Sequence, residues 1–177
     1  MEQIGASELK VIETERLRLR QFVPADAPFI LELLNEPSFI QNIGDRNVRT
    51  LSDAERYIET GPLTSYARNG FGLYLVQRKE ANESIGMCGL IKREALDDVD
   101  VGYAFLPRYW SKGYALESVM SVMEYAKNIV RLKRLVAIVD PNNQGSIRVL
   151  EKSGFRFEKM VRLSEDDIEL KLFTIEI

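Results

Sequence analysis

Three β-like segments follow one another with only short polar turns between them, and no other feature of the chain restricts the fold as strongly. The segments are residues 71–77, 85–91 and 99–106, and polar runs at 78–83 and 94–98 separate them. Turns of this length join neighbouring antiparallel strands, whereas parallel strands need a long crossover connection. The sequence therefore predicts an antiparallel three-stranded unit in the middle of the chain.

The apolar period becomes helical directly after this unit. Pro107 closes the third strand, and from Gly113 onward the apolar residues recur at helical spacing. A strand, a short loop and a long helix are thus expected in succession. The side chains expected to pack in the core are Ala115, Val119, Met120, Val122, Met123, Ala126 and Ile129.

Regular elements are also expected before residue 71. Leucine and arginine alternate over residues 16–20, which predicts a first strand with its leucines on one face. Two helical segments follow, and Pro24 opens the first of them. A capping box of Ser52 and Glu55 is expected to begin the second.

The C-terminal part alternates strands and helices. Residues 135–139 are a short β-rich run, and Asn143 begins a helix. The segments 155–163 and 168–175 are expected to form a final hairpin. The order β-α-α-β-β-β-α-β-α-β-β predicts one mixed α/β domain over residues 1–177.

The residue types that are missing limit the chemistry. The chain has no histidine, which excludes Ser-His-Asp and Cys-His mechanisms and every His-containing metal site. Cys88 is the only cysteine, and its apolar surroundings favour a small core residue over a nucleophile. Chemistry must therefore use carboxylates, hydroxyls, amines, backbone groups or a bound cofactor, and no metal is expected.

Charge and hydropathy limit the partners. A formal net charge of −3 without a clustered basic run argues against a nucleic-acid partner. No apolar run reaches the roughly 18 residues of a membrane-spanning helix. Residues 1–5 lack the features of a signal peptide, so a cytoplasmic location is expected, with residues 1–8 as a loose N-terminal extension. A homodimer is compatible with the sequence.

The loop between the third central strand and the long helix has the features of an anion site. Unpaired N–H groups of a helix start, together with the helix dipole, favour a negative group such as a pyrophosphate. Gly113 would let the backbone approach that group without a Cβ in the way. The loop matches neither the Walker pattern nor the dinucleotide pattern, and an ordinary strand-to-helix turn is the alternative.

Segments on both sides of the long helix resemble a known family. Residues 101–118, VGYAFLPRYWSKGYALES, resemble the acetyl-CoA-binding motif of the GNAT superfamily of N-acetyltransferases. Residues 139–155, VDPNNQGSIRVLEKSGF, resemble a motif of the subgroup that acetylates N-terminal alanines of ribosomal proteins, and residues 14–20, TERLRLR, resemble its first strand. The resemblance covers residues 9–177. It implies the GNAT fold, a mixed, mostly antiparallel sheet of about seven strands with flanking helices and a splayed central strand.

The resemblance also implies acetyl-CoA as the acyl donor. The pantetheine arm and the thioester carbonyl would be contacted by the main-chain groups of Ala104, Phe105 and Leu106. The pyrophosphate would be held by the backbone amides of Ser111, Lys112, Gly113, Tyr114 and Ala115. Asn143 would bond the pantetheine arm, and Ser146 would lie near the sulfur. The subgroup usually has glycine where this chain has Ser111, and phosphate binding is expected to survive that change.

The reaction needs a base. A primary amine with a pKa of about 10.4 must lose a proton before it attacks, and a carboxylate would accept that proton directly or through water. Asp100 begins the third central strand, and Asp98 is placed on the same face because strand side chains alternate. The resembling subgroup commonly has Glu at the Asp100 position, so Asp100 is the first candidate and Asp98 the second. A solvated turn with an edge charge is the alternative.

A proton donor for the leaving thiolate is less evident. Many members of the superfamily have Tyr seven residues beyond the position of Asn143, where this chain has Leu150. Ser146 is the remaining candidate by position, although a serine there more often bonds within the first helical turn. Tyr103 and Tyr109 are close to the expected site in the sequence, but the sequence does not predict where their side chains point.

These features predict an N-acetyltransferase that moves an acetyl group from acetyl-CoA to a primary amine by direct attack. The amine would belong to a protein N-terminus or to a small molecule such as a polyamine or an aminoglycoside. The alternative is a non-catalytic acyl-CoA-binding sensor or interaction module, which the missing tyrosine favours and the pair Asp98 and Asp100 opposes. Arg46 and Arg49 either border the acceptor site or are solvated, and Trp110 is expected to anchor its loop by burial.

Overall fold

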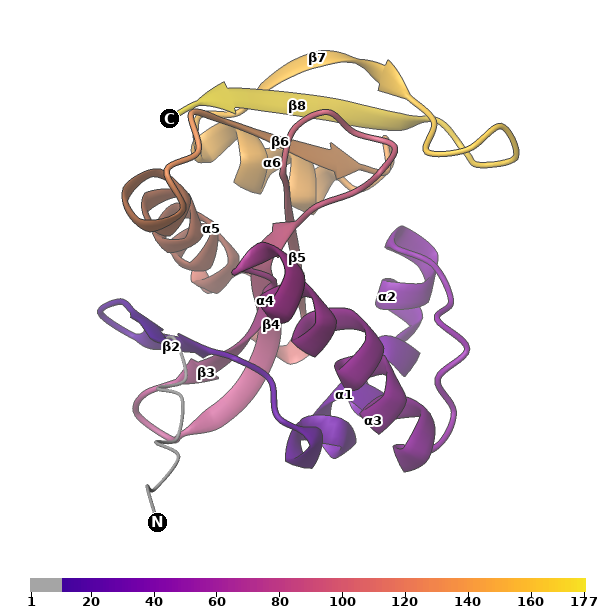
Figure 1. Cartoon of the computed structure of the whole chain (residues 1–177), viewed down its shortest axis with the longest axis vertical. Helices are drawn as coiled ribbons and strands as arrows, with labels where there is room; N and C mark the ends of the chain where they lie inside the picture. The colour runs from indigo at the N-terminus through magenta and orange to yellow at the C-terminus, as the bar shows by residue number, and fades with distance from the viewer. Residues whose placement is uncertain (1–10) are drawn as a thin grey trace.

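The computed structural model describes residues 11–177, so the extension expected at residues 1–8 lies outside the described residues. The described part contains an eight-stranded sheet in the order β1-β2-β3-β4-β5-β6-β8-β7 (Figure 1). Its strands are β1 (Val11–Glu13), β2 (Leu17–Arg20), β3 (Leu73–Arg78), β4 (Glu83–Ile91), β5 (Asp100–Phe105), β6 (Arg134–Val139), β7 (Arg156–Val161) and β8 (Leu170–Glu176). The expected mixed, mostly antiparallel α/β sheet is confirmed, and β1 adds a short strand at its edge.

Helices cover both faces of this sheet. They are η1 (Pro24–Asp26), α1 (Ala27–Asn35), α2 (Pro37–Asn42), α3 (Leu51–Ile58), η2 (Glu59–Leu63), α4 (Thr64–Asn69), η3 (Pro107–Tyr109), α5 (Tyr114–Tyr125), η4 (Ala126–Val130) and α6 (Gln144–Lys152). The crossovers β5-α5-β6 and β6-α6-β7 advance in one direction through the sheet, so right-handed connections put α5 and α6 on one face. Tyr125 of α5 packs edge-on against Tyr74 on this face. Arg20 reaches Asp26 of η1 on the opposite face, over which α1–α3 lie (Figure 1).

The predicted three-stranded unit is confirmed as β3, β4 and β5, which pair antiparallel. The next neighbour, β6, is parallel to β5 and shares with it a single register pair, Asp100 with Val136. Beyond this pair the two strands separate, with β6, β7 and β8 above the split and β2, β3 and β4 below it in Figure 1. The splayed central strand implied by the family resemblance is therefore β5.

Helix α3 begins earlier than the sequence predicted. The Thr50 Oγ1 accepts a hydrogen bond from the Asp53 backbone N–H at 3.1 Å, and the Asp53 carboxylate accepts one from the Thr50 N–H at 3.0 Å. The predicted capping box of Ser52 and Glu55 is therefore wrong. Thr50 is the residue with an extended backbone (φ −129°, ψ 163°) directly before the helix, so the box forms there.

Helix α5 and the first residue of η4 bury most of the face that the apolar pattern predicted. Fully or nearly buried side chains are Val119, Val122, Met123 and Ala126. Met120 and Ile129 are 45% and 64% exposed, so their assignment to the core is wrong. Ile129 lies in the π-helical turn η4, whose wider repeat rotates its side chain away from the face that α5 buries.

Residues 11–177 contain no group of three or more His, Cys, Asp or Glu side chains that could hold a metal ion. No helix within the same range is both long and apolar enough to cross a membrane.

Cys88 is fully buried, and burial raises the pKa of its thiol well above the ordinary value. Cys88 is therefore a protonated core residue, as predicted.

Candidate active site

The split leaves one edge of β5 without a partner strand. On the other edge, the Leu106 N–H donates to the Ile85 carbonyl at 3.0 Å. Since bonding directions alternate along an antiparallel strand, the main chain of Ala104 also faces β4, and that of Phe105 faces the split. The Leu106 carbonyl accepts a hydrogen bond from the Tyr109 N–H at 2.9 Å. The geometry therefore gives no support to the expected pantetheine contacts of Ala104 and Leu106, and it is compatible with the one expected for Phe105.

Trp110 anchors the loop in a different way from the one predicted. Its side chain is 49% exposed, so burial does not hold it. The indole Nε1–H instead donates to the Phe105 carbonyl at 2.8 Å. This bond ties the loop to the free edge of β5 and leaves the Phe105 N–H directed into the split.

The loop before α5 presents a row of backbone N–H groups. Ser111 has a φ of +60° and Gly113 a φ of +83°, so two residues of this short loop adopt left-handed conformations. Within residues 11–177, no hydrogen bond uses the N–H groups of 111–115 as donors. The positive φ of Ser111 gives a physical reason for glycine at this position in the resembling subgroup, since glycine adopts it without steric penalty. The geometry fits the predicted anion site at the positive end of the α5 dipole.

Side chains from the turn between β1 and β2 hold this loop, and the sequence did not predict this contact. The Arg16 guanidinium donates to the Lys112 carbonyl at 2.9 Å and pairs with Glu117 of α5 at 2.6 Å. The Thr14 hydroxyl donates to the same Glu117 carboxylate at 2.5 Å. Burial acts to raise the pKa of Glu117, but these hydrogen bonds outweigh it and hold the pKa below the ordinary value. The segments 14–20 and 101–118 thus contact each other. Their shared resemblance to one family was the only sequence feature that could have indicated this contact.

A second bridge crosses the split near its middle. Asn143 is the N-cap of α6, and its Oδ1 accepts a hydrogen bond from the Ser146 N–H at 3.1 Å. The Ser146 Oγ lies 2.7 Å from the Tyr103 Oη, and the Tyr103 hydroxyl is also 3.1 Å from the Ser146 carbonyl. Burial raises the pKa of Tyr103 well above the ordinary value, so its hydroxyl stays protonated. The structure thus orients Tyr103, which sequence reasoning did not, and joins it to the predicted Ser146.

Asp100 lies at the closed end of the split. It is 1% exposed, and its Oδ2 accepts a hydrogen bond from the Arg93 Nε at 2.6 Å. Its Oδ1 has no hydrogen-bond partner among the described residues. Burial raises the pKa of Asp100, and the Arg93 charge and the Ile138 backbone amide act against that rise. The alternative of an exposed edge charge is therefore wrong, and Arg93 is a site residue that the sequence did not reveal.

Asp98 is separate from this pair. β5 begins at Asp100, so the alternation used to place Asp98 on the same face does not apply. The Asp98 carboxylate instead lies 3.6 Å from the Arg134 guanidinium, which also pairs with Glu158 at 2.6 Å. Asp98 belongs to a partly exposed ion network, and its predicted catalytic role has no support from the geometry.

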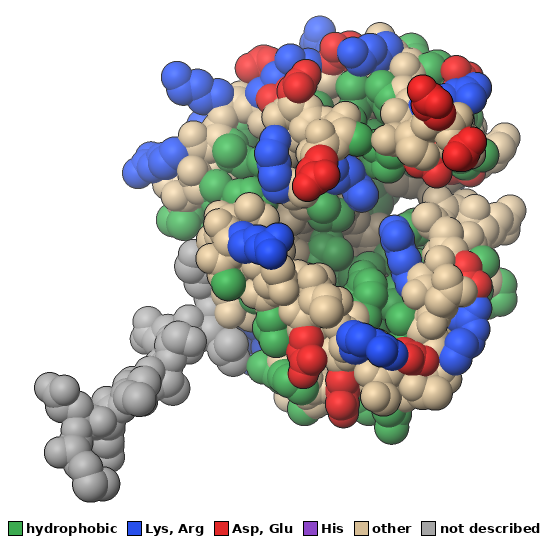
Figure 2. All heavy atoms as spheres, turned by 45° about the vertical axis from the view of Figure 1, so that its right-hand side comes forward, with side chains coloured by type: hydrophobic (Ala, Val, Ile, Leu, Met, Phe, Trp, Pro, Cys, Tyr) green, Lys and Arg blue, Asp and Glu red, His purple; other side chains and the backbone are tan. Residues whose placement is uncertain are grey.

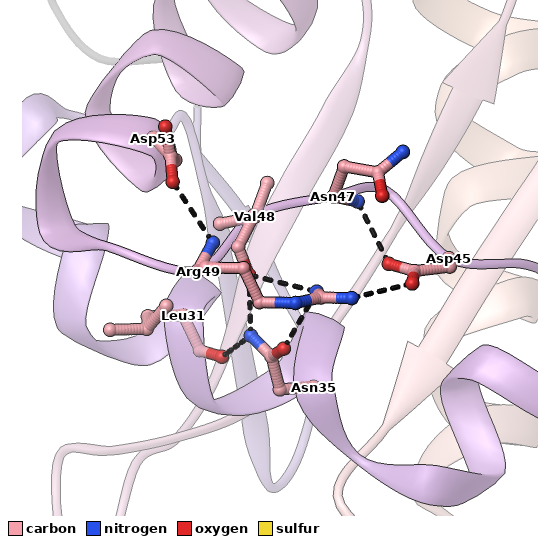
Figure 3. Close-up of polar contacts among 7 residues, drawn as sticks. All are labelled: Leu31, Asn35, Asp45, Asn47, Val48, Arg49 and Asp53. Carbon is pink, nitrogen blue, oxygen red and sulfur yellow. Dashed lines mark hydrogen bonds and ion pairs between the residues drawn. The ribbon is translucent and has the colours of Figure 1, made fainter.

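The two loop arginines differ. The Arg49 guanidinium donates to Asn35 at 3.0 Å and to Asp45 at 2.5 Å, and the Asn35 amide donates to the Val48 carbonyl at 2.8 Å (Figure 3). Arg49 therefore fixes the loop that precedes α3. Arg46 has no ion-pair partner within residues 11–177 and lines a pocket beside α3.

This side of the molecule is hollowed. Figure 2 shows a deep cleft with hydrophobic side chains at its bottom and Lys and Arg side chains along its rim. It lies between the upper half of the molecule, with β6, β7 and β8, and the lower half, with α1–α3. Through this cleft a second ligand could reach the split from the side of the sheet opposite to α5 and α6.

Comparison with known sequences identifies the family. Residues 16–156 match the model described as acetyltransferase (GNAT) domain. The protein YkkB of Bacillus subtilis (strain 168) is 29% identical over 154 residues, which cover 84% of this chain and 87% of YkkB. The N-acetyltransferase YoaA of the same organism is 28% identical over 153 residues, or 86% of each chain.

Solved structures share the fold. An acetyltransferase from Agrobacterium tumefaciens str. C58 aligns with a TM-score of 0.81 at 21% identity and covers 99% of both chains. RimL, a ribosomal L7/L12 alpha-N-protein acetyltransferase solved in complex with coenzyme A, aligns with a TM-score of 0.82 at 18% identity over 95% of this chain and 98% of its own. The ribosomal-protein-S5-alanine acetyltransferase from Vibrio fischeri reaches 0.79 at 20% identity over 94% and 96%. The chain therefore belongs to the GNAT family of N-acetyltransferases.

Proposed function

We propose that this enzyme binds acetyl-CoA along the split between β5 and β6 and transfers the acetyl group directly to a primary amine. The main support is the order of three features along the split: free backbone amides at the open end, the Tyr103–Ser146 bridge farther in and Asp100 at the closed end. The GNAT membership and the coenzyme A complex of RimL support the choice of donor.

The donor would be held mainly by main-chain groups. The pyrophosphate would accept hydrogen bonds from the backbone N–H groups of Ser111, Lys112, Gly113, Tyr114 and Ala115. The Phe105 N–H would donate to the pantetheine arm or to the thioester carbonyl, where it would stabilise the negative charge that develops during attack. The Asn143 Oδ1 is used within α6, so its side-chain NH₂ is the group left for pantetheine.

Asp100 would accept the proton of the attacking amine, directly or through a water. The amine nitrogen forms a bond to the thioester carbon, and the C–S bond then breaks to release the CoA thiolate. Deprotonating an ordinary primary amine at pH 7 costs about 4–5 kcal/mol, and an α-amine costs about 1–1.5 kcal/mol. Burial raises the pKa of Asp100, and the ion pair with Arg93 opposes that rise by favouring the carboxylate.

The Ser146 hydroxyl would donate a hydrogen bond to the departing thiolate. In this proposal the protonated Tyr103 hydroxyl donates to the Ser146 Oγ, instead of to the Ser146 carbonyl, and the serine proton is then free for the sulfur. This pair would substitute for the tyrosine that many family members have where this chain has Leu150.

The acceptor is proposed to be a protein N-terminus or a small amine. The names of RimL and the Vibrio fischeri enzyme describe action on ribosomal proteins, which supports an α-amine as one class to test. The test is release of free thiol from acetyl-CoA across peptides and small amines. Turnover with any amine supports the proposal, whereas acetyl-CoA binding without turnover would favour a non-catalytic sensor.

A further inference from the structure

A pocket of about 330 Å³ lies beside α3, on the face of the sheet that carries Asp100. Its volume is at the lower end of the range of small-ligand pockets, roughly 300–1,000 Å³. The polar residues that line it are Arg46, Asn47, Asp53, Arg56, Tyr57 and Thr60. We call it the Arg46 pocket.

The Arg46 pocket carries an excess of positive charge. Asp53 is its one acidic lining residue, and that carboxylate accepts hydrogen bonds from the Arg49 and Thr50 backbone amides and from Arg56 at 2.5 Å. These bonds, the Arg49 amide first, lower the pKa of Asp53 and keep it ionised. The charge of Asp53 offsets that of Arg56, and no ion pair within the described residues offsets that of Arg46.

Tyr57 connects this pocket to the proposed base. Its ring packs against the core, and its hydroxyl lies within electrostatic reach of both Arg46 and Arg93. Arg93 in turn contacts the Asp100 carboxylate at 2.6 Å. A molecule held at Arg46 would therefore lie on the same side of the sheet as Asp100, beside Tyr57, which lines the same pocket.

We propose that the acceptor carries a carboxylate or phosphate in addition to its amine, and that Arg46 and Arg56 bind this anionic group. This inference refines the proposed function and rests on it. Guanidinium groups match the planar oxygens of both anions and form charge-assisted hydrogen bonds with them. The same positive charge would repel polyamines and aminoglycosides, which removes two of the small-molecule classes considered above.

The test uses pairs of acceptors that differ only in the anionic group. The pairs are alanine and alaninamide, a peptide beginning Ala-Asp and one beginning Ala-Asn, and phosphoethanolamine and ethanolamine. Initial rates of thiol release are corrected for the fraction of unprotonated amine in each acceptor. We expect kcat/KM to be at least about tenfold higher for the anionic member of one or more pairs, mainly through KM.

Matched variants assign the effect to the pocket. Arg46→Gln and Arg56→Gln should each reduce the ratio of anionic to neutral kcat/KM by about tenfold. Lys127→Gln removes an equal charge from the exposed far end of the α5 region and should leave the ratio as it is. Thermal melting with and without acetyl-CoA checks that each variant folds and still binds the donor.

The outcomes separate the two proposals. Equal use of both members of every pair, or a preference for spermidine, would overturn the anionic acceptor and leave the acetyltransferase reaction standing. An unchanged ratio in Arg46→Gln would also overturn it. No turnover with any amine, despite donor binding, would overturn the proposed function and this inference together.

Discussion

Asp100 and Tyr103 lie on the same strand, and their side chains point to opposite faces of the sheet because their positions differ by an odd number. Asp100 meets Arg93 on the side of α1–α3, and Tyr103 meets Ser146 on the side of α5 and α6. In the proposed reaction the amine loses its proton on the first side, and the thiolate receives its hydrogen bond from the second. One strand thus separates the two proton-handling groups.

Asp100→Asn tests the base. Burial raises the pKa of Asp100, so the wild-type rate should fall as the pH drops through that raised pKa, where the protonated carboxyl no longer accepts a proton. The variant should lose about 10²–10⁴-fold in kcat. Its remaining rate should follow the fraction of unprotonated amine and rise with pH without that inflection. Rate–pH profiles for both proteins check this, and a profile that the substitution leaves unaltered would remove Asp100 as the base.

Tyr103→Phe tests the hydroxyl pair. The substitution keeps the ring and removes the hydrogen bond to Ser146, so kcat should fall about three- to tenfold with little change in the KM for acetyl-CoA. If Tyr103 acts through Ser146, the double variant with Ser146→Ala should be no slower than Ser146→Ala alone. Additive losses in that double-mutant cycle would show that the two hydroxyls act independently.

At the scale of elements, the start of α5 depends on the turn between β1 and β2, which is far away in the sequence. Arg16 and Thr14 bind Glu117 in the first turn of α5, and Arg16 also binds the carbonyl of Lys112 in the loop. The loop itself needs a left-handed backbone at Gly113. The backbone conformation of the loop and the side chains of the turn between β1 and β2 therefore both shape the proposed phosphate site.

Gly113→Val should abolish measurable acetyl-CoA binding. A Cβ there would lie 3.2 Å from the Arg16 Nη2, and the φ of +83° is strongly unfavourable for a β-branched residue. Gly61→Val is the matched control, because a Cβ at Gly61 meets no atom within 4 Å. Calorimetric titration of both variants measures the effect, and wild-type affinity in Gly113→Val would refute the pyrophosphate assignment.

At the scale of the whole molecule, the sheet has one place where two neighbouring strands, β5 and β6, are only weakly paired. β5 and β6 share a single register pair, whereas β4 and β5 pair over the full length of β5. The two halves on either side of the split are joined near Asp100 and by the Tyr103–Ser146 bridge across it. A ligand that bonds to both sides of the split would hold these halves together.

Acetyl-CoA should therefore raise the melting temperature. At a free concentration of 100 times Kd, a ligand that binds only the folded state adds about 2.7 kcal/mol to the free energy of unfolding. For a chain of this size that corresponds to a rise of about 5–11 °C. Differential scanning fluorimetry measures the shift, with ADP as the control that lacks pantetheine. An equal shift with ADP would mean that contacts between pantetheine and the split add nothing to the free energy of binding.

Part of this protein could be predicted from its sequence because the information is local. The short turns between 71 and 106 required antiparallel neighbours, and the change to helical spacing at Gly113 located the row of free amides. The absence of histidine left carboxylates and hydroxyls as the reactive groups. Each of these conclusions depends on residues that are adjacent in the chain, where backbone geometry and side-chain period decide the outcome.

The rest was decided only by the tertiary structure. Tyr103 contacts Ser146, which is 43 positions away in the sequence, and Thr14 contacts Glu117, which is 103 positions away. Local alternation placed Asp98 beside Asp100, but β5 begins too late for it to apply, and Arg134 became its partner. Such pairings follow from the order and splay of the strands, which no local period encodes. The sequence alone thus identified the chemistry that the chain can carry, and the fold determined which groups meet to perform it.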